Sequence, residues 1–396
     1  MSSEIKVAKG TGFTPARLWP VILLALIVFF PTAASAKAKP HAKFLLGADI
    51  SVLDSPGRGG AGRGLPPYQE DGEPSDELTV LSHDGWNAFR LRVFVSPVRN
   101  APNNTLENAI PLAKRIKAAG ATFILDIHFS DTWADPGHQE TPVAWRGMDF
   151  DALQKEFQQY AYDTVKAFKD ADAMPDIVQV GNEITRGMEW PLAEVQKPDA
   201  QTAATIGSDN EQVQWDHLTR LLKAGIRGVK SAAGGSPVRI AIHIDQGGHW
   251  NTTEWFFDHV RAAHIHYDII AQSFYPIWGH GTLDQLWENM NECARRYHKD
   301  FLVMETGYGP SHVQNNDDML WPITPQGRLQ FLVDLTNTVR KAPRGIGIMY
   351  WAPERDLWNA DGTPGPGVFV LDNLSVLTKR PESHAPAAIN PSTAGN

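Results

Sequence analysis

Eight short apolar runs alternate with longer amphipathic runs along most of this chain, and this alternation constrains the fold more than any other feature. The apolar runs span 43–51, 88–95, 122–129, 176–183, 238–245, 267–275, 301–306 and 346–351. Between them, segments such as 106–120, 151–171 and 210–232 repeat apolar residues every three to four positions, as a helix packed on one side does. Strictly alternating strands and helices predict parallel strands with right-handed crossovers. Eight such units favour an α/β fold of the closed (β/α)8 or TIM-barrel type, in a single domain, over an open doubly wound sheet.

The first 36 residues are predicted to be a secretory signal peptide. Lys6, Lys9 and Arg17 precede an unbroken apolar run at 21–30, which is too short to span a bilayer comfortably. Small residues at 34–36 then form a cleavage site. An uncleaved anchor is the alternative. The pattern predicts a secreted protein, extracellular or periplasmic, that has no membrane attachment once the signal is removed.

Residues 37–378 are expected to form the single barrel domain. Residues 379–396 contain almost no large apolar side chains and are expected to be a disordered tail, and the Gly- and Pro-rich segment 55–74 to be irregular. The net charge of −9 disfavours nucleic acid as a partner, and a neutral polymer fits better. A single cysteine, Cys293, excludes an intramolecular disulfide, so a large core would supply the stability. We expect a monomer.

Two glutamates end apolar runs in positions typical of catalysis. Glu183 ends VQVGNE, and Glu305 ends FLVME, 122 residues later. At roughly 40 residues for each β-α unit, this spacing places them on the fourth and seventh strands, facing each other across the mouth of a barrel. Facing carboxylates are the apparatus of glycoside hydrolysis. A solvated loop residue for Glu183 and a helix cap for Glu305 are the alternatives.

Two arginines on the second strand are expected to point into the barrel. Arg90 and Arg92 alternate with apolar residues, and a charge inside a barrel is costly unless it is paired. An arginine fork aimed at a carboxylate satisfies this requirement, and Glu305 is the expected partner of Arg90. A structural ion pair with Asp49 or Asp126 is the alternative for both arginines. Tyr275 ends the sixth strand and is expected to donate its hydroxyl hydrogen to Glu305.

Histidines and aspartates at other strand ends raise the question of a metal. His128, Asp131, His243 and Asp245 lie there, but their spacing is not diagnostic of a metal site. We therefore expect no catalytic metal and no required cofactor, while a structural Ca²⁺ held by loop carboxylates stays open. The chain contains no G-x-S-x-G elbow and no G-x-x-x-x-G-K-[ST] phosphate-binding loop.

Tryptophans concentrate where strands lead into helices. Eight of them lie in or beside these segments, and flat aromatic rings stack on the apolar faces of sugars. We expect these eight to surround one carbohydrate cleft; they are Trp133, Trp145, Trp190, Trp250, Trp278, Trp321, Trp351 and Trp358.

Together these residues resemble a known family. Asn182-Glu183 with Glu305 is similar to the clan A retaining barrel glycosidases, and the chain resembles glycoside hydrolase family 53, the arabinogalactan endo-β-1,4-galactanases. The resemblance rests on segments that follow the family's order along the chain: GADIS (47–51), RLRV (90–93), HFSDTWADPG (128–137), VQVGNE (178–183) and METGY (304–308).

The resemblance implies roles for individual residues. Glu183 would be the acid/base and Glu305 the nucleophile of a retaining double displacement. Asn182 would contact the sugar 2-hydroxyl, Arg90 and Tyr275 would orient the nucleophile, and Trp351 would form the floor of the subsite where cleavage occurs. The remaining expected substrate-binding residues are His128, Asp131, Trp133, Asp49 and His243.

The expected function is that of a secreted endo-acting hydrolase of β-1,4-galactan, the side chain of pectic arabinogalactan type I. The alternatives are a retaining clan A hydrolase of another β-linked polysaccharide and a non-catalytic carbohydrate-binding barrel. The presence of both Glu183 and Glu305 argues against the binding-only alternative.

Overall fold

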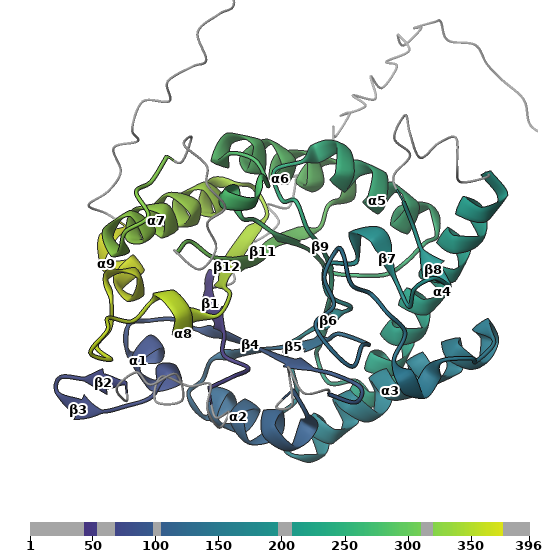
Figure 1. The fold of residues 1–396 in the computed structure, drawn as a ribbon, viewed down its shortest axis with the longest axis horizontal. Helices are drawn as coiled ribbons and strands as arrows, with labels where there is room; N and C mark the ends of the chain where they lie inside the picture. The colour runs from purple at the N-terminus through teal and green to yellow at the C-terminus, as the bar shows by residue number, and fades with distance from the viewer. Residues whose placement is uncertain (1–42, 54–67, 98–103, 197–207, 310–319, 375–396) are drawn as a thin grey trace, which may run out of the picture. The chain divides into compact units, whose positions relative to one another are not determined.

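The computed structural model describes residues 43–53, 68–97, 104–196, 208–309 and 320–374, and within them eight parallel strands form a closed barrel (Figure 1). In order around the barrel these are β1 (Leu45–Asp49), β4 (Ala88–Val93), β5 (Thr122–Ile127), β6 (Ile177–Val180), β9 (Arg239–Ile244), β10 (Ile269–Ser273), β11 (Asp300–Thr306) and β12 (Gly345–Tyr350). Because β12 pairs with β1, the sheet has no free edge. The predicted (β/α)8 barrel is confirmed, and the open-sheet alternative is wrong.

Helices cover the outside of the barrel, as Figure 1 shows. They are α1 (Glu77–His83), α2 (Leu106–Ala118), α3 (Phe150–Asp170), α4 (Ser208–Ala233), α5 (Trp250–Ala262), α6 (Leu283–Tyr297) and α7 (Pro325–Lys341), with the short α8 (Pro353–Asp356) and α9 (Val370–Asn373) after β12. Local sequence fixes several helix starts, because a Ser, Thr or Asp oxygen can accept one of the unpaired N–H groups of the first turn. Thr282 does so for α6, and Gln285 completes a capping box with it.

Smaller elements lie in the loops after the strands. They are the hairpin β2 (Gln69–Glu70) and β3 (Glu73–Pro74), the pair β7 (Gly187–Met188) and β8 (Ala193–Glu194), and the 3-10 turns Val143–Trp145, Ile184–Arg186, Pro276–Trp278 and Pro366–Phe369. The antiparallel β7–β8 pair lies in the loop after β6 and pairs Gly187 with Glu194 and Met188 with Ala193.

The interior of the barrel changes character along its axis. An apolar set fills its lower part and includes Ala88, Ile124, Ile177, Ala241, Ile269, Leu302 and Met349. Two residues further along β4, β5, β6 and β9, the same inward alternation places Arg90, Asp126, Gln179 and His243, all with no exposed surface. Apolar side chains therefore fill the part of the barrel nearer the N-terminal ends of the strands. A buried polar layer lies between this apolar part and the C-terminal mouth.

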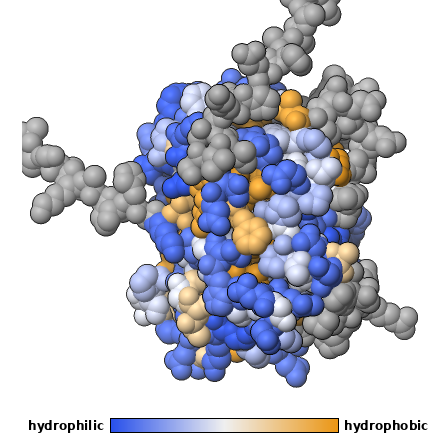
Figure 2. Space-filling model, turned by 90° about the vertical axis from the view of Figure 1, so that its left-hand side faces the viewer, coloured by the Kyte–Doolittle hydropathy of each residue, from blue (hydrophilic) through white to orange (hydrophobic). Residues whose placement is uncertain are grey.

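The surface is mostly hydrophilic on the side of the molecule drawn in Figure 2. Figure 2 shows the side over α7, α9 and α1, where apolar side chains of the described residues form separate spots within a polar surface. Among the described residues, no helix is long and apolar enough to cross a membrane. The predicted signal peptide at 1–36 and tail at 379–396 lie outside the described residues, as do residues 54–67 of the Gly-rich segment. The rest of that segment contains the β2–β3 hairpin.

Candidate active site

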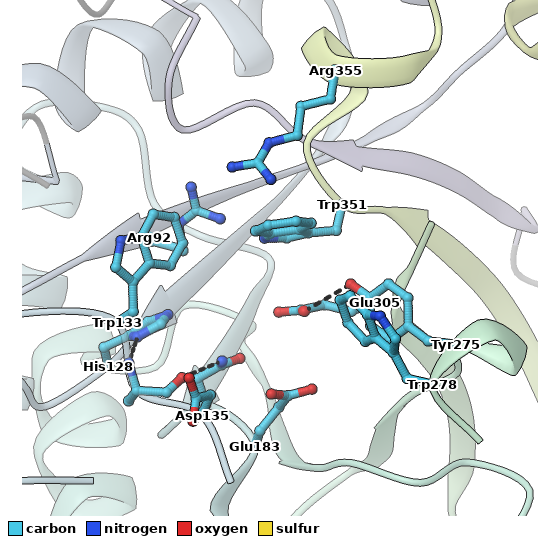
Figure 3. A pocket seen from close by; sticks show the side chains of 12 residues that line it. Arg92, His128, Trp133, Asp135, Glu183, Tyr275, Trp278, Glu305, Trp351 and Arg355 are labelled. Atoms are coloured by element: carbon cyan, nitrogen blue, oxygen red, sulfur yellow. Dashed lines mark hydrogen bonds between the residues drawn. The ribbon is translucent and has the colours of Figure 1, made fainter. Parts of the chain in front are cut away.

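A cavity of about 430 Å³ opens at the C-terminal ends of the barrel strands (Figure 3). This is the face on which barrel enzymes carry their active sites. The residues that line it are Arg92, His128, Trp133, Ala134, Asp135, Asn182, Glu183, Tyr275, Trp278, Glu305, Trp351 and Arg355. Glu183 and Glu305 both point into it, as the sequence analysis expected of the pair.

The backbone at Glu183 is held in an unusual conformation. Three residues beyond the end of β6, Glu183 adopts the left-handed region with φ 47° and ψ 48°, a region that non-glycine residues seldom occupy. Gln139 from the preceding loop donates from Nε2 to the carbonyl oxygens of Asp135 at 3.1 Å and Asn182 at 2.7 Å. This bridge joins the two loops behind the glutamate and stabilises the turn that aims its side chain into the cavity.

The environment of Glu183 favours its protonated form. Burial is the main cause of a pKa well above the ordinary value of a glutamate, and the negative charges of Glu305 and Asp245 raise it further, whereas a hydrogen bond donated by Ser273 acts to lower it. Ser273, at the end of β10, is hydrogen-bonded to Oε1 of Glu183. A carboxyl group that keeps its proton near neutral pH can act as a general acid.

A bulge in β11 is what places Glu305 in the cavity. Leu302 and Met304 belong to the apolar set inside the barrel, so regular alternation would turn Glu305 outward. The register between β10 and β11 shifts at this point, pairing Gln272 with Val303 but Ser273 with Glu305. The extra residue re-aims the glutamate toward the mouth, a known use of bulges beside active sites.

Glu305 is surrounded by donors. Nη1 of Arg90 lies 2.6 Å from its Oε1, and the hydroxyl of Tyr275 donates to Oε2 at 3.2 Å. Burial, followed by the charge of Glu305, raises the pKa of Tyr275 well above that of a free phenol, so the tyrosine keeps its proton and remains a donor. The expected pairing of Arg90 with Glu305 and the expected hydrogen bond from Tyr275 are both present.

Arg90 also makes the structural ion pairs with Asp126 and Asp49 that are the alternative prediction for this residue. Its Nη2 lies 2.5 Å from Oδ2 of Asp126, and its Nε lies 3.5 Å from Oδ2 of Asp49. Burial opposes the charge of Asp126, but Arg90 and His128 hold its pKa below the usual range of an aspartate. The two interpretations of Arg90 are therefore complementary, because one guanidinium bridges a structural carboxylate and the carboxylate in the cavity.

Asn182 is fixed by the same polar layer. Its Oδ1 accepts hydrogen bonds from Arg90 at 3.0 Å and Gln179 at 2.9 Å, and its Nδ2 donates to the carbonyl of Ala134 at 2.8 Å. The amide orientation follows from these partners, since arginine offers only donors. Asn182 lines the cavity with a defined orientation of its amide group.

Aromatic and histidine side chains form much of the remaining wall. Trp133 and Trp351 meet edge to face with ring centroids 6.2 Å apart, and Arg92 lies over the Trp133 ring at 4.3 Å. Nδ1 of His128 accepts from the backbone N–H of Ala134 at 3.1 Å, which leaves its Nε2 to donate to Asp126. His128, Trp133 and Trp351 therefore lie in the cavity as expected.

Three other residues expected to bind substrate lie outside this cavity. Asp131 accepts from the backbone N–H groups of Ser96 and Val143, which ties loops together. Asp49 pairs with Arg92 at 3.1 Å and lines only a narrow adjoining pocket. His243 is fully buried between Asn182 and Ser273. In the described part of the chain these three side chains have structural roles, because their polar groups contact other protein groups.

The expectation that eight tryptophans surround the cleft is wrong. Three line the cavity: Trp133, Trp278 and Trp351. The other five contact protein: Trp145 and Trp321 are buried in the core, the indole nitrogens of Trp190 and Trp358 donate to Arg186 and Glu77, and Trp250 begins α5 beside Tyr297. Indole rings serve as core residues as readily as sugar platforms, and position along the chain does not distinguish the two uses.

Sequence reasoning missed several contributors. Asp135 and Arg355 line the cavity, and Ser273 contacts Glu183, yet none was singled out. Ser273 lies two residues before the expected strand end at Tyr275, so its inward direction could have been inferred. The orientation of Arg355, which follows β12 and lies over Trp351 at 4.7 Å, depends on loop geometry. Among the described residues, no group of three or more His, Cys, Asp or Glu side chains is placed to hold a metal.

A closed (β/α)8 barrel with two buried glutamates facing one cavity at its C-terminal mouth defines the class of this protein as a barrel glycoside hydrolase. Comparison with known sequences gives the family. Residues 45–379 match the model of glycosyl hydrolase family 53, and the chain belongs to this family.

Relatives cover most of this chain. An uncharacterized protein of Niallia circulans is 37% identical over 334 residues, 80% of this chain and 86% of its own length. The arabinogalactan endo-β-1,4-galactanase of Humicola insolens is 33% identical over 284 residues, 69% of this chain and 80% of that protein. A solved fungal β-1,4-galactanase superposes with a TM-score of 0.71 at 29% identity, covering 83% of this chain and 99% of the fungal one.

Proposed function

We propose that this protein is an endo-acting β-1,4-galactanase that cleaves the galactan side chains of pectic arabinogalactan type I with retention of configuration. The observation that carries the proposal is the contrast between two buried glutamates at one cavity: Glu183 has no cationic partner among its described contacts and favours its proton, whereas Glu305 is ion-paired with Arg90. The family and its named galactanases support galactan as the substrate.

In the first step, Glu305 attacks the anomeric carbon while Glu183 donates its proton to the departing glycosidic oxygen. A covalent glycosyl-enzyme forms at Glu305 as the glycosidic bond breaks. Tyr275 and Arg90 hold the attacking carboxylate at its two oxygens, which limits the geometries from which it can react.

In the second step, Glu183 acts as the base. It lost its proton to the leaving group, and it now takes one from a water molecule that attacks the glycosyl-enzyme and releases Glu305. Glu305 is esterified and uncharged in the glycosyl-enzyme, so it does not oppose the ionised form of Glu183 that acts as the base. Release of Glu305 as a carboxylate restores the negative charge that, with Asp245, raises the pKa of Glu183 in the free enzyme.

Substrate sugars are proposed to stack on the aromatic wall. Trp351 and Trp133 form one part of this wall, and Trp278, with 43% of its surface exposed, forms another beside Tyr275. One hydrogen on Nδ2 of Asn182 goes to Ala134, and the second is proposed to serve a sugar hydroxyl. Asp135 would supply a further polar contact, whereas both ring nitrogens of His128 are already bonded to Ala134 and Asp126, so this residue would contribute only the edge of its ring to the wall.

The setting of the enzyme is part of the proposal. Residues 1–36 would direct secretion, and the mature protein would act as a monomer on a polysaccharide, with no nucleic-acid or membrane partner and no required cofactor. A structural Ca²⁺ is testable by dialysis against a chelator, with thermal unfolding as the readout.

The test measures reducing-end release by the protein lacking residues 1–36 on β-1,4-galactan, mannan, xylan and β-glucan, with Glu305→Gln as the blank. We expect activity on galactan that the blank lacks, with first products in the β configuration by proton NMR. Activity on another polymer would assign a different substrate, α products would overturn retention, and binding without turnover would favour a carbohydrate-binding barrel.

A further inference from the structure

We propose that Ser273 and His243 are positioning residues that hold the proton of Glu183. The side chains of His243, Ser273 and Glu183 form a hydrogen-bonded relay. With His243 neutral, all contacts in this relay are hydrogen bonds only when Glu183 is protonated. The inference rests on the proposed acid/base role of Glu183. His243 was expected to bind substrate, and its burial points instead to this indirect role.

The relay is a continuous chain of contacts, and its Ser273 and His243 side chains are inaccessible to solvent. Nε2 of His243 lies 2.9 Å from Oγ of Ser273, and that oxygen is hydrogen-bonded to Oε1 of Glu183. On the other side of the ring, Nδ1 of His243 lies 2.9 Å from Oδ1 of Asn182. Ser273 and His243 have no exposed surface, so the relay must satisfy its own donors and acceptors without solvent.

The position of the imidazole hydrogen follows from Asn182. Its Oδ1 accepts from Arg90 and Gln179, which identifies this atom as the oxygen of the amide. An oxygen cannot donate, so Nδ1 of His243 must carry the hydrogen of this contact. In a neutral imidazole, Nε2 is then a bare acceptor that requires a donor from Ser273.

The surroundings of His243 favour the neutral ring. Burial and the adjacent guanidinium of Arg90 lower its pKa well below the ordinary value, and His128 acts in the same direction. Asp126 opposes this effect but is neutralised by Arg90 at 2.5 Å.

Ser273 has one hydroxyl hydrogen for two neighbours. When Glu183 carries its proton on Oε1, it donates to Oγ of Ser273, and Ser273 donates to Nε2 of His243, so every contact is a hydrogen bond. When Glu183 is a carboxylate beside a neutral His243, both neighbours are acceptors, and one of them loses its donor. Moving the extra proton along the relay onto His243 would also close it, but Arg90 disfavours a second cation there.

Charges on the other elements around Glu183 act in the same direction. Glu305 on β11, Asp245 after β9 and Asp135 in the loop after β5 all disfavour a second negative charge. The relay further favours the protonated form of Glu183. Oγ of Ser273 accepts a hydrogen bond from the acid, whereas Nε2 of His243 competes with the carboxylate for the hydroxyl hydrogen of Ser273. After Glu183 has protonated the leaving group, the unsatisfied relay favours recovery of a proton from water.

The test is the sign of a pH shift in Ser273→Ala. A hydroxyl that merely donated to the carboxylate would stabilise the ionised form, and its loss would move the alkaline limb of the kcat/KM profile on galactan upward. The relay predicts the opposite, a downward shift of roughly 0.5 to 1 pH unit, the size of one buried hydrogen bond. Ser273→Thr keeps the hydroxyl and is expected to restore the limb. An upward shift, or none, overturns the proposal.

A second measurement does not depend on activity. The difference in unfolding free energy between the parent and its Glu183→Gln variant changes with pH until Glu183 has ionised in the folded state, and then becomes constant. In a Ser273→Ala background, this plateau should begin at a lower pH by the same 0.5 to 1 unit. An unchanged or higher onset overturns the relay. If instead Glu183→Gln keeps full activity on galactan, the proposed acid/base role fails, while this titration still reports on the relay.

Discussion

The two sides of the cavity each hold a glutamate, but they surround its carboxyl group with opposite kinds of neighbour. On the β11 side, Glu305 faces a fixed cation, Arg90, and the hydroxyl of Tyr275. On the β6 side, Glu183 faces the neutral pair Ser273 and His243 and is further disfavoured as an anion by nearby carboxylates. One barrel mouth thus supports an ion-paired carboxylate and a carboxylic acid, because burial first and nearby carboxylates second favour the proton of Glu183, whereas Arg90 gives Glu305 a cationic partner.

The charged side is most severely broken by Glu305→Gln. The amide cannot form the glycosyl-enzyme, and we expect reducing-end release to fall by about 10⁴-fold or more. Arg90 also loses one of its anionic partners, so the unfolding free energy should drop by about 1–3 kcal/mol in urea titrations. Substantial residual turnover would contradict the nucleophile assignment.

The variant Asp126→Asn tests the structural ion pair between Arg90 and Asp126. This change leaves the buried guanidinium of Arg90 without the carboxylate at 2.5 Å, and breaking a buried pair in this way costs about 3–5 kcal/mol. Chemical denaturation should detect the loss. Asp172→Asn, which replaces an acidic residue just after the end of α3 that is not among the cavity residues, is the matched control and should change stability little.

Glu183→Gln breaks the neutral side. We expect activity on galactan to fall by about 10²–10⁴-fold, since general acid catalysis is lost. An aryl β-galactobioside with an acidic phenol as leaving group needs less protonation, so its first step should be much less affected. An equal loss on both substrates would contradict the role of Glu183 as the acid.

The same variant should gain stability at neutral pH. The raised pKa of Glu183 in the folded protein means that its stabilising contribution is full below the unfolded value of about 4.3 and is lost as pH rises through the folded value. The amide that Glu183→Gln introduces does not titrate, so the variant should be more stable than the parent near pH 7, with the difference vanishing near pH 4. This gain has the opposite sign to the effect of Glu305→Gln, which makes the comparison between the two sides measurable by denaturation alone.

Tyr275→Phe weakens the charged side without removing a charge. The lost hydrogen bond to Oε2 of Glu305 is expected to lower kcat by about 10-fold, since hydrogen bonds to charged groups are worth about 1.5–3 kcal/mol. Steady-state kinetics on galactan will show this as a change in kcat more than in KM. An unchanged kcat would mean that Arg90 alone orients the carboxylate.

Trp278→Ala is expected to have the smallest effect. Its ring is 43% exposed at the cavity and is proposed to stack on a sugar, so its loss should raise KM several-fold and leave kcat nearly unchanged. Trp287→Ala, which removes an equally exposed tryptophan on the outer helix α6, is the control and should leave both constants unchanged. A large fall in kcat would place Trp278 closer to the reacting sugar than proposed.

Much of the fold was predictable because its signals are local. Alternating apolar and amphipathic segments predicted all eight barrel strands, and the expected helices at 106–120, 151–171 and 210–232 correspond to α2, α3 and α4. The pairing of Arg90 with Glu305 was also predictable, since inward alternation along β4 and the cost of a buried charge leave few partners.

Other features of the site were not predictable, because they depend on how separate loops meet. Nothing in the sequence around Trp145 or Trp321 distinguishes these buried tryptophans from Trp133, which lines the cavity. Likewise, His243 lies at a strand end like His128, yet Ser273 and Asn182 enclose it while His128 reaches the cavity wall.

The sequence by itself determined the barrel, the family and the presence of two glutamates at one mouth, because strand periodicity and short motifs are written in neighbouring residues. Only the tertiary structure decided how those glutamates are oriented and which groups surround them. A one-residue shift in β11 turns Glu305 inward against its strand's alternation, and a left-handed turn held by Gln139 aims Glu183. The charged and polar neighbours of each glutamate are on strands that are far apart in the sequence. Burial in the closed barrel strengthens the electrostatic interactions between these neighbours and the glutamates.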